Sequence, residues 1–172
     1  MTTAHATSLH TLPIEPLTTE AFAPFGEVIE ATASVRQYPI NQGTTIRYHA
    51  LAQVETAGDD AEAIISIFRG QQFDLPLTLH TMERHPLGSQ AFIPMASQQF
   101  LVVVCQGGER PDANTLRAFI TNGTQGVNYR TGTWHHALLN LAEKGDFLVV
   151  DRSGTGNNCD ECALPEPVTI TG

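Results

Sequence analysis

The sequence predicts a mainly β protein, organised as a sandwich or a barrel, with one short helix near its N-terminus. Short runs of alternating or continuously apolar residues recur along the chain, which is the pattern of half-buried and buried strands. Turn residues, and not helical segments, separate these runs. Chains of this kind form sandwiches or barrels, whereas strands alternating with helices would form βαβ units.

The one expected helix covers residues 17–26. Thr18 can cap its N-terminus and Gly26 can end it. Before it, we expect residues 1–8 to form a flexible leader. Neither a repeat nor a linker interrupts the rest of the chain, so residues 9–172 are expected to form a single domain.

Strand patterns begin where this helix ends. We expect strands at residues 26–29, 45–49, 63–69, 75–85, 90–94, 100–105, 116–120, 126–128, 134–139 and 147–151. Dipeptides such as Gly88-Ser89 and Asn122-Gly123 supply the turns between them. Residues 106–115 contain Gly107-Gly108 and Pro111-Asp112, and we interpret this segment as an exposed hairpin connection and not as an active-site lid.

Composition excludes several classes of protein. The chain has 9 Lys+Arg against 18 Asp+Glu and a formal charge of −9, which argues against a surface for nucleic acid or anionic membranes. Its longest apolar runs, at residues 100–105 and 147–150, are too short to cross a bilayer. The start of the chain lacks the features of a signal peptide, and three cysteines cannot all pair. We therefore expect a cytoplasmic protein.

Chemically useful side chains gather in two segments. Glu83 and His85 are two residues apart on an expected strand and so share a face. Gln90 begins the next strand after a short turn and can return to the same pocket. Much later, His135 and His136 follow a glycine turn. Because neighbouring residues on a strand face opposite ways, one of these two histidines should point inward.

The spacing Glu83-x-His85-x4-Gln90, followed by Gly132-x2-His135, resembles the two motifs of the cupin superfamily. Metal-binding cupins usually supply two His and a Glu from the first motif and one His from the second. Here Glu83 stands at the first His position and Gln90 at the Glu position. A carboxylate with two neutral imidazoles is still a workable ligand set. Glu83, His85 and His135 are therefore the candidate metal ligands, and metal-free catalysis remains an open alternative.

A longer string resembles the ureidoglycolate lyase family, formerly called ureidoglycolate hydrolase. The resemblance lies in the runs ERHPLGSQAFIPM (83–95), FLVVV (100–104), LRAFI (116–120), QGVNY (125–129), WHH (134–136) and DR (151–152). It implies a cupin-like, jelly-roll type β-barrel, a single catalytic domain and a homodimer. It also implies the cleavage of (S)-ureidoglycolate to glyoxylate and urea in allantoin and purine nitrogen catabolism, with nickel (Ni2+) as the suggested metal.

Cleavage of such a substrate requires three groups on the protein: one that holds the carboxylate, one that takes the hydroxyl proton, and one that protonates the departing nitrogen. Arginine holds a carboxylate best because its planar fork binds both oxygens. Arg69 and Arg152 are our candidates for this role. Arg130 is a further one, and Arg84 alternates out of phase with the proposed site. Arg152 also has a structural alternative as an ion pair with its neighbour Asp151.

We expect His85 and His135 to form the acid/base pair, with Glu83 as the third catalytic group if burial raises its pKa. If a metal is bound, the same residues would be its ligands. Gln90 and Tyr129 would bind the ureido group through neutral hydrogen bonds.

Other interpretations stay open. The chain could be a metal-dependent cupin that acts on another small carboxylic acid, or a non-catalytic cupin that binds a small metabolite. A hydrolase releasing ammonia would differ from a lyase only in its products. His49 and His80 are expected to be structural. Cys159 and Cys162 form a lone CxxC, which we interpret as surface thiols in a loop.

Overall fold

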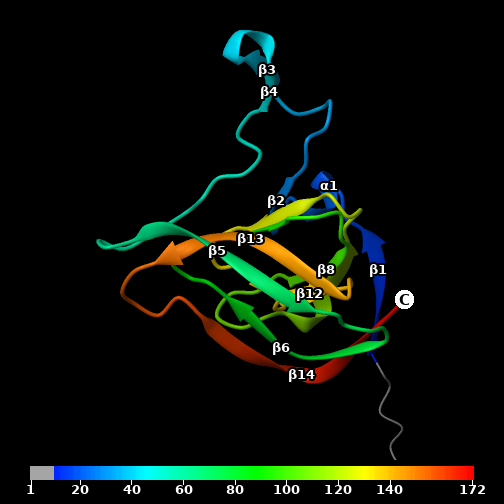
Figure 1. Cartoon of the computed structure of the whole chain (residues 1–172). Helices are drawn as coiled ribbons and strands as arrows, with labels where there is room; N and C mark the ends of the chain where they lie inside the picture. The colour runs from blue at the N-terminus through cyan, green and yellow to red at the C-terminus, as the bar shows by residue number, and fades with distance from the viewer. Residues whose placement is uncertain (1–9) are drawn as a thin grey trace, which may run out of the picture.

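The computed structural model describes residues 10–172 of the chain and shows two layers of β-sheet (Figure 1). The expected leader, residues 1–8, lies outside the described residues. The larger sheet has the strand order β11-β6-β14-β1-β9-β8-β12, and β11 pairs with β8 as well as with β6. This second pairing closes six of the strands into a barrel. The strands of the larger sheet are β1 (His10–Pro16), β6 (Leu77–Arg84), β8 (Phe100–Cys105), β9 (Arg117–Ile120), β11 (Trp134–His135), β12 (Leu139–Asn140) and β14 (Asp160–Thr171).

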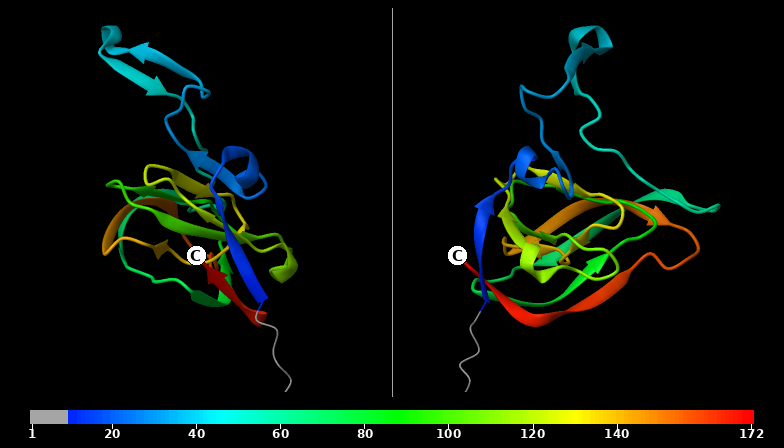
Figure 2. Two further views of the ribbon diagram at one scale, coloured as in Figure 1. Left: turned by 90° about the vertical axis from the view of Figure 1, so that its right-hand side faces the viewer. Right: turned by 180° about the vertical axis from the view of Figure 1, so that it is seen from behind.

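The second layer is a five-stranded sheet in the order β2-β10-β7-β13-β5, antiparallel throughout. Its strands are β2 (Gly26–Ile29), β5 (Glu62–Gln71), β7 (Gln90–Pro94), β10 (Gly126–Tyr129) and β13 (Lys144–Ser153). A separate hairpin, β3 (Gln37–Ile40) and β4 (Thr45–Tyr48), is joined by the 3-10 turn η1 (Asn41–Gly43). Figures 1 and 2 show this hairpin standing away from both sheets. The expectation of a mainly β protein that forms a barrel is confirmed.

Two apolar cores hold these layers, and β8 serves both. Leu101, Val103 and Cys105 point into the barrel, where they pack with Trp134. Their alternate neighbours on β8, such as Val102, point the other way into the core shared with the five-stranded sheet. Such a strand is buried on both faces, which explains its unbroken apolar sequence.

The short helix α1 (Thr19–Phe22) is capped as expected, because the Thr18 hydroxyl accepts a hydrogen bond from Ala21 N at 3.1 Å. Gly26 does not end the helix, however, but opens β2. The predicted strands at 90–94 and 100–105 are confirmed. Residues 106–115 connect the antiparallel pair β8 and β9 and contain the turn η2 (Ala113–Thr115), as expected of a hairpin connection.

The sequence pattern missed three strands, and it predicted a single strand where the structure has two. The strands β1, β3 and β14 were not predicted, and the strand expected at 134–139 is two short strands, β11 and β12. Pro165 and Pro167 obscured β14; they lie where its register against β6 shifts, a place that tolerates the missing N–H of proline. Cys162 therefore lies on β14 and not in a loop, although both thiols are free as expected.

Among the described residues, no helix is both long enough and apolar enough to span a membrane.

We predict that Gly26→Ala destabilises the fold. A Cβ at this position would lie 1.8 Å from the carbonyl oxygen of Asn128 on the paired strand β10. The backbone of a paired strand cannot move aside without disturbing the sheet. Overpacking of this kind costs about 1–3 kcal/mol, which urea denaturation would measure. Gly108→Ala is the matched control, since nothing lies within 4 Å of its Cβ position. Equal stability of the two variants would contradict this packing account.

Candidate active site

The structure brings together five of the predicted site residues, between the outer face of the barrel and the inner face of the five-stranded sheet. On the barrel side, Glu83 of β6 is the register partner of His135 on β11. On the opposite side, Gln90 of β7 is the register partner of Tyr129 on β10. Register partners share a face of their sheet, so both pairs project into the same space, which His85 enters from the end of β6.

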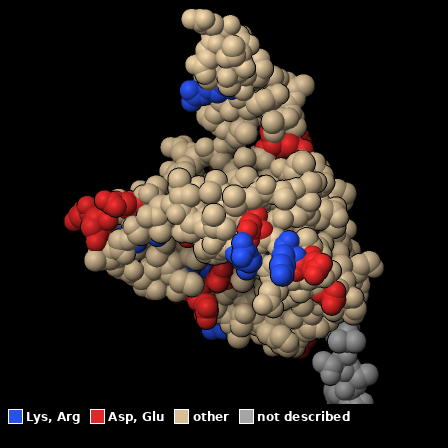
Figure 3. Space-filling model, viewed as in Figure 1, with Lys and Arg blue, Asp and Glu red and all other residues tan. Residues whose placement is uncertain are grey.

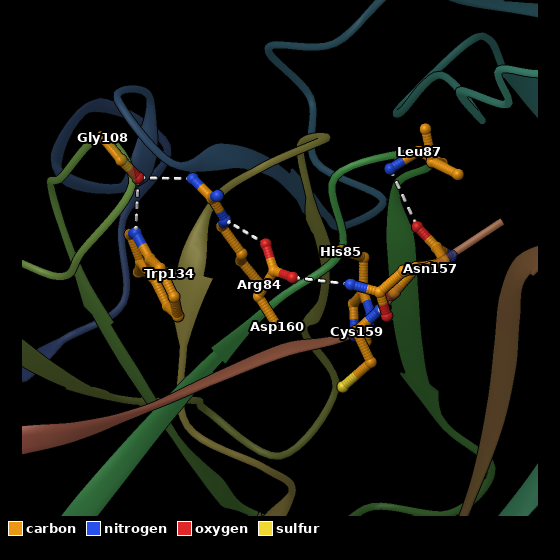
Figure 4. Close-up of polar contacts among 9 residues, drawn as sticks. Arg84, His85, Leu87, Gly108, Trp134, Asn157, Cys159 and Asp160 are labelled. Carbon is orange, nitrogen blue, oxygen red and sulfur yellow. Dashed lines mark hydrogen bonds and ion pairs between the residues drawn. The ribbon is translucent and has the colours of Figure 1, made fainter.

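His85 is held by backbone contacts on two sides. Its Nδ1 lies 2.7 Å from the carbonyl oxygen of Asn158, and its own carbonyl accepts a hydrogen bond from Gly132 N at 2.8 Å. The Asn158 side chain also accepts a hydrogen bond from Leu87 N at 2.8 Å and so fixes the turn that follows His85. Figure 4 shows His85 and Leu87 beside the segment that runs from Asn157 to Cys159. With Nδ1 donating to a carbonyl, Nε2 of His85 is left facing the site, 3.1 Å from Gln90 Oε1.

His135 is almost completely buried, with 1% of its surface exposed. Its ring stacks on Tyr129 with centroids 4.1 Å apart and an interplanar angle of 3°. Its Nδ1 lies 3.0 Å from the His136 carbonyl oxygen, while Nε2 is buried without a hydrogen-bond partner. Burial lowers the pKa of His135 to about 3, so the ring is neutral and Nε2 offers a free lone pair.

Glu83 lies beside both imidazoles. One of its carboxylate oxygens is 3.9 Å from His135 Nδ1. Burial raises the pKa of the Glu83 carboxyl, and the charges of His85 and His136 work in the opposite direction. Glu83 also lines a cavity of about 140 Å³ together with Thr81, Met82, His136, Ala137 and Glu161. That cavity is smaller than a drug-sized pocket of roughly 300–1,000 Å³, and Glu83 is the one predicted site residue among those that line it.

Glu83, His85 and His135 fit the requirements of a metal site. One ligand atom from each lies within 4.8 Å of the others. Both histidines turn Nδ1 toward a backbone carbonyl, which is the usual second contact of a metal-ligating imidazole. The unpartnered Nε2 of His135 is a buried polar atom that a metal would satisfy. Two neutral imidazoles and a carboxylate suit zinc, nickel or iron.

Sequence reasoning missed two residues that support the site. Gln90 donates through Nε2 to Asp151 Oδ2 at 3.3 Å, and Asp151 Oδ1 is buried without a partner. Asn158 accepts from His85 and Leu87, as described above. Asp151 could have been found, since it ends an apolar strand pattern as an isolated carboxylate; Asn158 acts mainly through its backbone and left no signal.

The two arginines expected to bind substrate are not at this site. Arg69 forms a bidentate ion pair with Asp146 at 2.7 and 2.8 Å. It lies five residues along β5 from Ile64, the residue opposite Asp151, which is about 17 Å on a strand. The Arg152 guanidinium is buried under the loops at residues 57–60 and 154–156, where it donates to Ala57 O and Thr155 O at 2.7 Å each. It therefore neither pairs with Asp151 nor reaches the imidazoles.

The other two arginine candidates are also occupied. Arg130 pairs with Glu27 at 3.3 Å. Arg84 faces away from Glu83, as expected from strand alternation; it pairs with Asp160 at 2.9 Å and lies over the Trp134 ring at 4.9 Å. Figure 4 shows Arg84 paired with Asp160, and Arg84 and Trp134 both donating to the carbonyl oxygen of Gly108.

A β-barrel with two imidazoles and a half-buried carboxylate between its layers defines an enzyme-type site for a small molecule. Comparison with known proteins narrows this class. The sequence profile described as ureidoglycolate lyase matches residues 9–171, and the chain therefore belongs to the ureidoglycolate lyase family.

Individual relatives agree with this assignment. The chain is 59% identical over 153 residues to a ureidoglycolate lyase of Pseudomonas fluorescens SBW25, covering 89% of this chain and 91% of the relative. It is 57% identical over 158 residues to the ureidoglycolate lyase of Pseudomonas entomophila L48, covering 92% and 94%. A solved Bacillus subtilis oxalate decarboxylase with Mn(II) centres is a distant match, with 11% identity, a TM-score of 0.35, and coverage of 68% of this chain and 31% of that one.

We predict that the His135 ring stays neutral, with its proton on Nδ1, from pH 8 down to pH 5. The reason is burial, which lowers its pKa to about 3; a lowered pKa moves protonation to more acidic pH. Nitrogen-15 NMR of the His135 imidazole would check this. Protonation of the His135 ring between pH 8 and pH 5 would contradict the burial argument.

Proposed function

We propose that this chain cleaves (S)-ureidoglycolate to glyoxylate and urea, as a carbon–nitrogen lyase of allantoin and purine nitrogen catabolism. The observation that carries the proposal is the pair of imidazoles, His85 and His135, beside Glu83, within a chain that matches the family over nearly its whole length. We also propose a cytoplasmic location, which the three free thiols support.

The reaction has a simple balance. The hydroxyl proton leaves, the carbon–oxygen double bond forms, the carbon–nitrogen bond breaks, and the departing nitrogen gains a proton to become urea. The protein must therefore accept one proton and donate one. Hydrogen bonds to the ureido group hold the leaving group in line for this exchange.

We propose that Glu83, His85 and His135 hold a divalent metal ion, with nickel as the first candidate. When bound, such an ion supplies Lewis-acid polarisation of a substrate oxygen. The lowered pKa of His135 favours a role as a metal ligand over a role as a general base. A group whose pKa is about 3 is too weak a base near neutral pH, but it is already in the neutral form that metal binding needs.

The remaining residues then bind substrate and move protons. Burial and the Glu83 charge raise the pKa of the Tyr129 phenol, so it stays protonated and can donate to the ureido oxygen. Gln90 is oriented by Asp151 and offers its amide to the same group. Proton transfer needs groups outside the ligand set, and His136 and Glu161 line a cavity together with Glu83.

A metal-free arrangement uses the same residues differently. His85 would take the hydroxyl proton, and Glu83, whose pKa is raised by burial, would carry a proton to the leaving nitrogen. The two arrangements differ in one measurable property, the response of the enzyme to a chelator.

We predict that the purified protein releases glyoxylate and urea in equal amounts from (S)-ureidoglycolate, without ammonia. Glyoxylate, urea and ammonia would be quantified together, before and after chelation and after nickel is restored. Loss of activity with the chelator and its recovery with nickel would support the metal arrangement. Ammonia in place of urea would indicate a hydrolase, and glyoxylate at only the spontaneous rate would overturn the proposed function.

We predict that His85→Gln and His135→Gln each lower kcat/KM by about 10²–10⁴-fold, the usual range for a group taking part in the chemistry. Metal content, measured on the same preparations, should fall with them. His80→Gln is the matched control, because His80 is an exposed imidazole of the same strand that ends at the site. Wild-type kinetics in both site variants would exclude these histidines from the reaction.

A further inference from the structure

The proposed substrate carries a carboxylate, yet the basic side chains near the site are already engaged. All 9 Lys and Arg residues lie within residues 10–172. Five arginines have fixed partners in the structure: Arg69 with Asp146, Arg84 with Asp160, Arg117 with Glu15, Arg130 with Glu27, and Arg152 with two backbone carbonyls. The other four are Arg36, Arg47, Arg110 and Lys144.

Two of these four are directed elsewhere in the same chain. Lys144 begins β13, paired with Gln71, at the opposite end of that strand from Asp151. Arg110 belongs to the loop whose Gly107 and Gly108 lie against Trp134. The Trp134 side chain is in the barrel core, on the other face of β11 from His135.

Carboxylates near the site strengthen the case for an additional cation that binds the substrate anion. Three carboxylates lie in this region: Glu83 is 3.9 Å from His135, Asp151 accepts a hydrogen bond from Gln90, and Glu161 lines a cavity with Glu83. His135 is neutral. The charges of His85 and His136 act against these carboxylates. No arginine or lysine of the five fixed pairs lies among these groups, so a further cation at contact range would favour the binding of an anionic substrate.

The sheet that carries Gln90 and Asp151 ends at its edge strand β5, and we call this edge the open side of the site. Ile64 on β5 is the register partner of Asp151. Four large apolar side chains of β5 are exposed: Ile64 by 38%, Ile65 by 71%, Ile67 by 59% and Phe68 by 39%. Figure 3 shows mainly uncharged atoms on this side of the molecule, with a cluster of basic and acidic side chains among them. A long apolar edge strand is a surface that proteins normally cover.

The β3–β4 hairpin has the complementary properties. It extends away from the two sheets of its own chain (Figure 2), and it exposes 50% of Ile46 and 37% of Tyr48. Residues 31–54 contain Arg36 and Arg47 but no Asp or Glu, so the hairpin is positive in a chain whose formal charge is −9. Blue atoms mark this region in Figure 3.

The two arginines of the hairpin differ in their surroundings. Arg36 lies over the Tyr38 ring at 5.6 Å and lines a cavity with Glu27 and Glu30 of its own chain. Arg47 is on β4, all of whose residues are exposed, and no hydrogen bond or ion pair holds its side chain within the part of the chain that the structure describes.

We propose that a second copy of this chain covers β5 and lays its β3–β4 hairpin across the open side of the site, where Arg47 of the partner subunit binds the substrate carboxylate. The proposal rests on the proposed function, since it assigns the place of the substrate anion. Because each copy has both the hairpin and the open site, a two-fold arrangement would complete both sites at once. Apolar contacts between the hairpin and β5 would bury surface that is exposed in the single chain.

A mixed dimer tests this arrangement directly. One copy carries His135→Gln, the other Arg47→Ala, and different affinity tags allow the heterodimer to be purified after co-expression. Each variant alone should have little activity. In the heterodimer, the site with an intact His135 receives an intact Arg47 from its partner, so about half of the wild-type activity should return. A heterodimer no more active than its parents would overturn the proposal, since each hairpin would then serve its own chain.

Kinetics of the single variants identify the role of Arg47. Arg47→Ala should raise KM for ureidoglycolate by about 10–100-fold, the usual effect of losing a charge-assisted hydrogen bond, and Arg47→Lys should restore part of the loss. The neutral amide analogue of the substrate should be bound equally by wild type and Arg47→Ala. Arg36→Ala is the matched control and should keep the wild-type KM. A wild-type KM for Arg47→Ala would overturn the assignment.

Sedimentation equilibrium separates this inference from the proposed function. The wild type should have the mass of two chains, and Ile65→Asp, which places a charge on the exposed face of β5, should shift the equilibrium toward one chain. A wild type that releases glyoxylate and urea as a monomer would overturn this inference and leave the function standing. A dimer that releases no glyoxylate would overturn both the function and the role of Arg47.

Discussion

The rest of the structure depends on β11, a strand of only two residues. It pairs with β6 on one side and β8 on the other, and these pairings close the barrel. Because neighbours on a strand point to opposite faces, Trp134 fills the barrel core while His135 stacks on Tyr129 outside it. The same two residues therefore complete the fold and present the site, and the stacking and the Nδ1 contact with a carbonyl offset part of the cost of burying the imidazole.

Much of the site could be predicted because its signals are local. Glu83 and His85 share a strand face, a short turn returns Gln90 to the same region, and the glycine turn before His135 marks the second segment. The chain ends could not be predicted in this way. The strand β1 pairs in parallel with both β14 and β9, so its partners are distant in sequence, and prolines in β1 and β14 hide their strand character from any reading of local pattern.

The arginine predictions failed for a related physical reason. The partner of a surface arginine is chosen by the folded sheet and not by sequence neighbourhood: Arg69 meets Asp146, 77 residues away, because β5 and β13 pair in that register. Arg152 is next to Asp151 in sequence, yet strand alternation turns it to the opposite face, where backbone carbonyls hold it. Sequence identifies which residue types can bind a carboxylate, but only the register shows which of them are already engaged.

The total charge of the chain says less about substrate binding than these local pairings do. At physiological salt the Debye length is about 8 Å, so acidic groups on distant surfaces contribute little at the site. Groups within contact distance are screened much less, and the Glu83 carboxylate lies at this range from His135. A site for a small hydroxy acid must therefore obtain its positive charge at contact range, from an ion held by Glu83 and the two imidazoles and from a basic side chain that no carboxylate of its own chain has already paired. Within the described residues the hairpin best meets the second condition, because Arg47 is exposed and the residues around it from 31 to 54 include no acid.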